Sequence, residues 1–190
     1  MMAKYAMIHD SVKCIGCQGC TIACRSENAI PDGFFRLKVK MDGPHGVFPN
    51  LSFNYVRHSC EMCEHTPCVT VCPTHASFMD ENGIVDIDAS QCVGCLYCVV
   101  ACPYNARYVN PETKVPDKCN FCKHTHLKQY GEPACVAVCP TDALVFGDLD
   151  DPNSPIFDIL TTKPFVVNKP HLGTKPKLFV IPNSKGGITL

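Results

Sequence analysis

The sequence predicts an α+β fold in which short strands and short helices frame loops that are rich in cysteine. Three observations support this prediction: sixteen cysteines in 190 residues, short segments in which apolar and polar residues alternate, and a cysteine-free C-terminal part rich in proline and glycine. Alternation with a period of two is typical of strands. Regular structure is therefore expected in small pieces between the cysteine loops.

The composition is that of a folded protein. Hydrophobic residues make up 46% of the chain, and its length suits one or two compact domains. The formal net charge of -1 argues against nucleic acid as a partner. No apolar run is long enough to cross a bilayer, there is no C-terminal membrane anchor, and the N-terminal segment contains neither an apolar core nor a twin-arginine pair.

Apolar segments next to the cysteine loops predict the individual strands and helices. "KYAMI" precedes the first cysteine and "ALVFG" follows the last one, and both are expected to be strands. "SFM" and "GIVDID", joined by the turn "DENG", predict a hairpin. Short helices are expected to begin in "CTIACRSENAI", "CVTVC" and "CVVAC".

Residues 29–58 predict a two-stranded β-ribbon inserted between the first and second cysteine groups. Apolar and basic residues alternate along its first half: Phe35, Leu37, Val39 and Met41 with Arg36, Lys38 and Lys40. A turn rich in glycine and proline leads to a second alternating segment, "LSFNY". The basic edge is interpreted as a solvated polar face, with docking to an acidic partner as the alternative.

The sixteen cysteines form four groups of four with none left over. Each group begins C-x2-C and ends C-x3-C, and the middle gap is two, four, two and twelve residues in turn. The groups are Cys14, Cys17, Cys20 and Cys24; Cys60, Cys63, Cys68 and Cys72; Cys92, Cys95, Cys98 and Cys102; and Cys119, Cys122, Cys135 and Cys139. Proline follows three of the groups, at Pro73, Pro103 and Pro140. The internal repeat is therefore one of ligands rather than of packing residues.

The third group, "CVGCLYCVVACP", matches the C-x2-C-x2-C-x3-C-P run of bacterial ferredoxins, in which three thiolates hold one [4Fe–4S] cluster and the fourth ligates another. A loop with this spacing can surround three corners of a cluster. Glycines between the cysteines, Gly16, Gly19 and Gly94, allow the backbone to approach closely. Four complete groups predict four [4Fe–4S] clusters.

Disulfides and zinc are the alternative uses of these cysteines. Sixteen cysteines allow eight disulfides by count, but the repeated ferredoxin spacing would be an unusual way to encode them. Zinc suits separated C-x2-C pairs, so only the fourth group alone could pass for a zinc ribbon. His124 and His126 lie in the long gap of that group, where four cysteines are already present, and are expected to be surface histidines.

Further short motifs match one family along nearly the whole chain: "YAMIHD", "CPTHA", "CPYNARY", "DKCNFC", "CPTDA", "FGDLDDPNSP" and "GTKPKLFVI". In these motifs the chain resembles the four-cluster, ferredoxin-type iron–sulfur (B) subunits of molybdoenzyme complexes in the dimethyl sulfoxide reductase superfamily. It looks most like the electron-transfer subunits of polysulfide and thiosulfate reductases.

The resemblance implies a crossed set of cluster ligands, in which the last cysteine of each group serves a different cluster from the other three. The implied sets are Cys14, Cys17, Cys20 and Cys139; Cys24, Cys119, Cys122 and Cys135; Cys60, Cys63, Cys68 and Cys102; and Cys72, Cys92, Cys95 and Cys98. The fold implied is two nested bacterial-ferredoxin-like modules with a β-ribbon insertion and an extended C-terminal tail. The expected domains are an outer module of residues 1–28 plus 117–147, the ribbon 29–58, an inner module 59–116 and the tail 148–190.

The tail contains no cysteine and is not expected to form a core alone, so it either packs across the modules or contacts a partner subunit. Basic residues next to cysteines are expected to raise the reduction potentials of the clusters. These residues are Lys13, Arg25, His58, Lys118 and Lys123.

The function implied is electron transfer without catalysis, because the sequence shows no phosphate loop, nucleophile elbow or substrate-binding domain. Electrons would pass from an integral membrane quinol-oxidising subunit to a molybdopterin-containing catalytic subunit that reduces a sulfur compound. The alternatives are the same role in a tetrathionate, arsenate, dimethyl sulfoxide or nitrite-linked reductase, a soluble subunit of a formate dehydrogenase or hydrogenase, and a metal-bound structural scaffold. The expected location is the surface of a bacterial inner membrane, bound through partner subunits, on the periplasmic face or else the cytoplasmic one.

Overall fold

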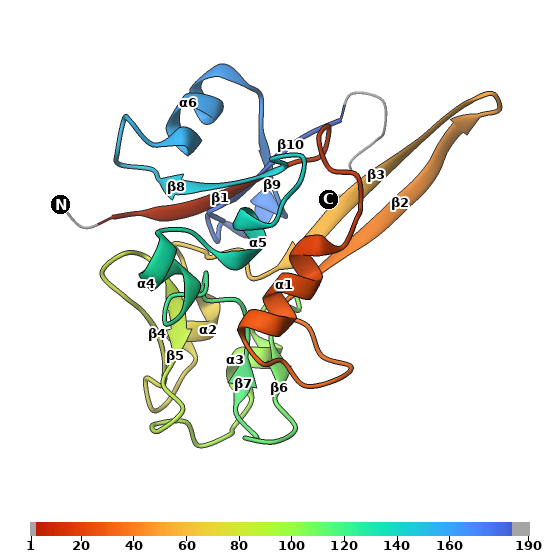
Figure 1. The fold of residues 1–190 in the computed structure, drawn as a ribbon. Coiled ribbons are helices and arrows are strands. Elements are labelled where there is room, and N and C mark those ends of the chain that lie inside the picture. The colour runs from red at the N-terminus through yellow and green to blue at the C-terminus, as the bar shows by residue number, and fades with distance from the viewer. Residues whose placement is uncertain (1–2, 184–190) are drawn as a thin grey trace.

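The described part of the chain, residues 3–183 of a computed structural model, contains ten short strands and six short α-helices (Figure 1). The strands are β1 (Tyr5–Asp10), β2 (Leu37–Val47), β3 (Asn50–Ser59), β4 (Ser77–Met79), β5 (Val85–Ile87), β6 (Tyr108–Val109), β7 (Pro116–Asp117), β8 (Leu144–Asp148), β9 (Val166–Val167) and β10 (Leu178–Ile181). The helices are α1 (Gly19–Glu27), α2 (Pro67–Thr70), α3 (Tyr97–Val100), α4 (His126–Tyr130), α5 (Ala134–Ala137) and α6 (Pro155–Thr162), with one 3₁₀ turn, η1 (Pro170–Leu172). The predicted α+β class is confirmed.

A four-stranded sheet in the order β8-β1-β10-β9 lies at one side of the molecule (Figure 1). β1 is one of its two inner strands, antiparallel to β8 and parallel to β10. Because side chains alternate along a strand, Ala6 and Ile8 pack on one face of the sheet with Ile156 of α6, while Met7 packs on the other face with the cysteine-lined core. β1 is therefore buried on both faces, as its apolar sequence allows.

The remaining strands form three separate two-stranded pieces. β4 pairs with β5 and β6 with β7, both antiparallel, and these small hairpins lie at the opposite side of the molecule from the large sheet (Figure 1). β2 and β3 form the predicted ribbon, which projects away from the body. Its far end exposes Val47 and Phe48, whereas Leu37 and Arg57 at its base are buried.

The main core is built partly from cysteine. Cys24, Cys60, Cys119 and Cys135 are buried in the same cluster as the fully enclosed side chains of Met62 and Phe121. A core of this kind contains sulfur where other proteins of this size would place leucine or isoleucine. Its packing therefore depends on what the sulfur atoms bind.

The described part of the C-terminal tail, residues 148–183, packs back across the body, and the rest of the predicted tail lies outside the described residues. β10 enters the sheet beside β1, and just before it the backbone of Thr174 and Lys175 accepts hydrogen bonds from His65 and Glu64 at 3.1 and 2.9 Å. The tail also contains helix α6, which the sequence analysis did not predict and which begins at Pro155, a favoured residue for a first helical turn. No helix within residues 3–183 is long and apolar enough to cross a membrane.

Candidate iron–sulfur sites

Site 1 is a cavity that joins the first and fourth cysteine groups. It is lined by Cys14 and Cys17, from the loop between β1 and α1, by Cys20 in the first turn of α1, and by Cys139, which follows α5. The loop can turn so tightly because Gly16 and Gln18 adopt left-handed backbone conformations, with φ of 67° and 63°. Residues far apart in the sequence thus enclose one cavity.

Site 2 gathers Cys24 of helix α1 with Cys119, Cys122 and Cys135 of the fourth group. The side-chain Nδ2 of Asn28 lies 3.9 Å from the sulfur of Cys24 and 3.6 Å from that of Cys122. Burial raises the pKa of Cys24, and the neighbouring thiols of Cys119, Cys135 and Cys122 raise it further. The four thiols are therefore close enough to interact.

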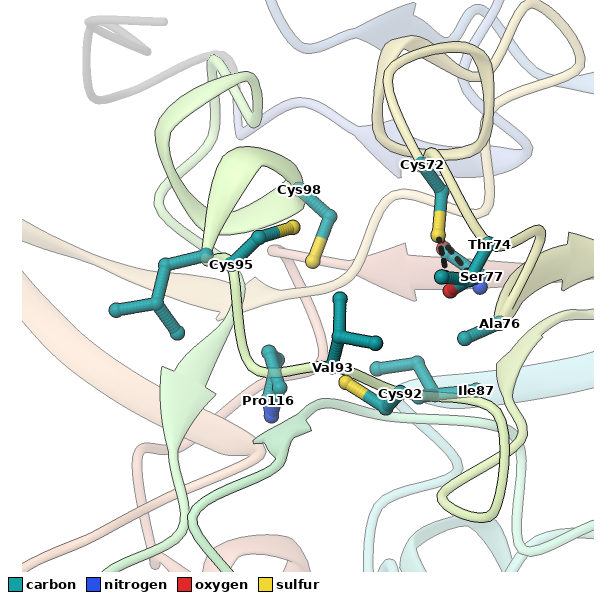
Figure 2. Close-up of a pocket in the computed structure, with 11 residues that line it drawn as sticks. Cys72, Thr74, Ala76, Ser77, Ile87, Cys92, Val93, Cys95, Cys98 and Pro116 are labelled. Carbon is teal, nitrogen blue, oxygen red and sulfur yellow. Dashed lines mark hydrogen bonds between the residues drawn. The ribbon is translucent and has the colours of Figure 1, made fainter.

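Sites 3 and 4 lie in the second and third cysteine groups. The cavity of site 3 is lined by Cys60, Cys63, Cys68 and Cys102. The cavity of site 4 is lined by Cys72, Cys92, Cys95 and Cys98, whose sulfur atoms Figure 2 shows turned toward the space between them. In all four sites the structure brings together three cysteines of one group and the last cysteine of another. Ligation of a cluster by each set stays a prediction.

Burial opposes the ionisation of eight of these thiols, whose pKa it raises. Burial raises the pKa of Cys63 and of Cys135 to about 12 in each case. A thiol must lose its proton to bind iron, so metal binding has to supply the favourable energy that offsets this shift. Enclosed sets of four thiols fit a cofactor that is itself positively charged, as the [4Fe–4S]²⁺ core is.

Cys72 and Cys139 differ from the other thiols because each begins a "C-P-T-x-A" motif. Burial alone would raise their pKa, but hydrogen bonds to the sulfur outweigh it, and the net shift of both is downward. The backbone N–H of Ser77 donates to Cys72 over 3.4 Å, and that of Ala143 donates to Cys139 over 3.3 Å. The repeated motif thus builds the same sulfur-binding turn twice.

The structure pairs several of the cations that sequence adjacency selected. Arg25 bonds to Asp32 at 2.7 Å and Lys123 to Asp80 at 2.7 Å, so a carboxylate offsets each charge. The ammonium group of Lys118 is buried and donates to the backbone carbonyls of Val85 and Cys119.

The basic edge of the ribbon is smaller than its sequence suggested. Arg36 does not belong to it, because its guanidinium turns inward and pairs with Asp117 at 2.8 Å. Lys38 and Lys40 are exposed as expected.

The two histidines in the long gap of the fourth cysteine group both have a protein partner. His124 bonds to Asp86 at 2.8 Å, and the ring of His126 bonds to the carbonyl of Glu132 at 2.7 Å.

Three polar residues beside the sites were missed by the sequence analysis. Arg57 and His9 line the cavity of site 1, and Arg107 lines that of site 3. The one available signal was strand alternation: His58 was selected because it lies near Cys60, but it is exposed and its neighbour Arg57 points inward. Burial and the Arg57 charge lower the pKa of His9 to about 4, so this ring is neutral near pH 7.

The α+β fold and its enclosed cysteine sets define a ferredoxin-type iron–sulfur protein. A family model described as "4Fe-4S dicluster domain" matches residues 51–149. The sequence is 61% identical to the B subunit of polysulfide reductase from Wolinella succinogenes over 99% of both proteins. It is 50% identical to protein NrfC of Escherichia coli over 98% of this chain and 84% of the relative. It is also 56% identical to the thiosulfate reductase electron transfer subunit PhsB of Salmonella typhi, over 78% of each.

The chain therefore belongs to the family of ferredoxin-type iron–sulfur subunits that includes the polysulfide reductase B subunit and thiosulfate reductase PhsB. As a member of this family it binds multiple [4Fe–4S] clusters, and its role is electron transport.

Proposed function

We propose that this protein binds four [4Fe–4S] clusters and transfers electrons one at a time within a reductase complex. They pass from a membrane quinol-oxidising subunit to a molybdopterin-containing catalytic subunit that reduces polysulfide or thiosulfate. The observation that supports this best is the gathering of sixteen cysteines into four sets of four. The match to the polysulfide reductase B subunit along 99% of the sequence supports the choice of substrate.

The residues assigned to the clusters are the cysteines of sites 1 to 4. When bound, a [4Fe–4S] cluster supplies reversible one-electron transfer. The protein contributes ligands at fixed positions, N–H donors to sulfur at Cys72 and Cys139, and apolar packing that excludes water. Cys24, Cys119 and Cys135, for example, are buried in the same core as Phe121. In this proposal the protein performs no substrate chemistry.

A nitrite-linked complex is the second candidate. The sequence analysis left this terminal acceptor open, and the 50% identity to NrfC over 98% of the chain does not favour a sulfur compound over it. In both cases the protein would lie at the surface of a bacterial inner membrane, held there by its partner subunits and, as we propose, on the periplasmic face.

The test is anaerobic affinity purification of the full chain from detergent-solubilised membranes, followed by metal analysis and identification of co-purifying proteins. The expected result is about sixteen iron atoms per chain, at four per cluster, together with a molybdenum-containing large subunit and a membrane subunit that oxidises quinol. The preparation should reduce polysulfide or thiosulfate with a quinol as donor. Zinc in place of iron, or a chain that purifies without a molybdenum protein, would contradict the proposal.

A further inference from the structure

Two arginines are buried beside the cysteine sites, one in each half of the molecule. Arg57 lies on β3 and is 3% exposed, and Arg107 lies between α3 and β6 and is 6% exposed. A buried charge is costly unless hydrogen bonds and an opposite charge compensate it. The contacts of both side chains therefore have to be accounted for.

The guanidinium of Arg57 uses only part of its hydrogen-bonding capacity within the protein. Its Nη1 donates to Ser59 Oγ over 2.6 Å. Nε and Nη2 are buried, and among the described residues they have no hydrogen-bond partner. Buried N–H groups without partners are rare in folded proteins, so a partner is expected in the adjoining cavity.

Arg57 faces two of the cysteine sites at once. It lines the cavity of site 1. Its guanidinium lies close enough to interact electrostatically with Cys20, which belongs to site 1, and with Cys119 and Cys135, which belong to site 2. The guanidinium is therefore close to sites 1 and 2, the pair of sites in the predicted outer module.

Arg107 repeats this arrangement in the other half of the molecule. Its Nη2 donates to Ser77 Oγ over 2.8 Å, while Nη1 is buried and has no partner among the described residues. It lines the cavity of site 3. Ser77, which accepts this hydrogen bond, lines the cavity of site 4. Each arginine thus donates to one serine and adjoins both sites of one pair.

Other cations differ in that protein groups already accept their hydrogen bonds. The partly buried Arg36 forms an ion pair with Asp117 at 2.8 Å, and the buried ammonium groups of Lys118 and Lys177 donate to backbone carbonyls. Within residues 3–183 neither Arg57 nor Arg107 forms an ion pair. Glu61 is the carboxylate that interacts with Arg57, and it accepts its hydrogen bond from Asn168 instead.

We propose that Arg57 and Arg107 are equivalent positioning residues. Each places between the two clusters of one pair a positive charge that forms no ion pair, and N–H donors without a protein partner, within the described part of the chain. Four thiolates around a [4Fe–4S]²⁺ core leave about -2 at each site, and reduction adds another negative charge. A buried cation between two such sites stabilises the reduced state of both, because charges interact strongly where water is excluded. Each arginine therefore raises two reduction potentials and lowers the repulsion between the paired clusters. This inference rests on the proposed four-cluster function.

The test uses the full chain with its clusters, purified anaerobically, and reduction potentials measured by redox titration followed by electron paramagnetic resonance. Arg57→Gln and Arg107→Gln remove the charge, Arg57→Lys and Arg107→Lys retain it, and Lys128→Gln removes an exposed charge of helix α4 as a control. We expect Arg57→Gln to lower two reduction potentials by about 59 mV each, which corresponds to about a tenfold change in the one-electron equilibrium constant. Arg107→Gln should lower the other two. The reduction potentials of the lysine variants should stay close to the wild-type values. The control variant should change none of the four potentials.

Three results would overturn the inference while leaving the proposed function standing, provided that wild-type iron is near sixteen atoms per chain. They are unchanged potentials in both glutamine variants, equal shifts of all four clusters in either variant, and shifts in the lysine variants as large as those in the glutamine variants. If one glutamine variant fails to retain iron, the other glutamine variant and the two lysine variants decide by the same criteria. Wild-type iron far below sixteen atoms would instead overturn the proposed function and this inference together.

Discussion

Asn28 lies within 3.6 Å of the sulfur of Cys122, although 94 residues separate the two in sequence. The same amide group donates to the backbone carbonyl of Cys24 over 2.9 Å, at the end of helix α1. Asn28 Oδ1 in turn accepts a hydrogen bond from Arg36 over 2.7 Å, and Arg36 pairs with Asp117 just before the fourth group. This network connects the first cysteine group to the fourth and so helps to form site 2.

Single cysteine substitutions should therefore group by site and not by position in the sequence. We expect Cys24→Ser and Cys122→Ser to remove or alter the same paramagnetic signal, with loss of up to about four iron atoms each. Cys20→Ser, only four residues from Cys24, should alter a different signal, because Cys20 lines site 1. Identical spectra for Cys20→Ser and Cys24→Ser would contradict the proposed ligand sets.

Gly16 and Gly94 provide a matched pair, because each precedes the second cysteine of its group with nearly the same φ, +67° and +69°. Alanine at either position takes up a left-handed conformation that costs about 1–2 kcal/mol. At Gly16 the added Cβ would also overlap the ring of Tyr55, whereas at Gly94 the nearest atom, Lys114 O, is 4.0 Å away. Thermal unfolding should show a larger loss of stability for Gly16→Ala than for Gly94→Ala. Equal losses would show that the Tyr55 ring moves aside freely.

The threonines of the two "C-P-T-x-A" motifs should adjust the potential of one cluster each. Thr74 Oγ1 lies 3.8 Å from Cys72 Sγ, and Thr141 Oγ1 lies 3.9 Å from Cys139 Sγ. Valine removes the hydroxyl at nearly constant shape. We expect Thr74→Val to lower the potential at site 4 and Thr141→Val that at site 1. Each shift should stay below tenfold in the one-electron equilibrium constant, about 59 mV, because the backbone N–H donors remain. A shift in the potential of any other site would contradict the assignment of Cys72 to site 4 and of Cys139 to site 1.

Ile156 should be important for stability although it is far from the cysteine groups in sequence. It is fully buried and packs against Ala6 and Ile8 of β1 and Ile181 of β10. Ile156→Ala should cost about 2–5 kcal/mol in the free energy of unfolding. The neighbouring Phe157 is 38% exposed, and Phe157→Ala should cost clearly less. Denaturant unfolding of the two variants measures this difference, and equal costs would disprove the assigned packing.

Removal of iron should unfold much of the protein. Four buried cysteines belong to the main core, so an empty site leaves thiols without a ligand and unfilled space where packing is needed. We expect treatment with a chelator under reducing, anaerobic conditions to abolish the cooperative thermal transition and to expose the backbone amides of β1 to hydrogen exchange. The control is the same treatment without chelator. An apoprotein with an unchanged transition would show that the apolar side chains suffice for folding.

Many of the short strands and helices could be predicted from local sequence patterns. The strand at "KYAMI", the hairpin of "SFM" and "GIVDID", the ribbon and the helices at the third cysteine of the first three groups all formed as predicted. In each case alternation or a run of apolar residues next to a turn was sufficient. Helix α6 and the β6–β7 hairpin were not predicted, because β6 and β7 have two residues each and α6 is stabilised mainly by its packing on β8 and β1.

By itself the sequence determined the chemistry of this protein, since cysteine spacing within a few residues specifies which cofactor a loop can hold. Only the tertiary structure decided which distant residues adjoin each site. Arg57, on a ribbon strand 37 positions after Cys20, and Arg107 have no local pattern that marks them, and Arg36 had the pattern of an exposed residue but turned inward to Asp117. The physical reason is that charge compensation in a buried region acts through space, between segments that come together only when the protein folds.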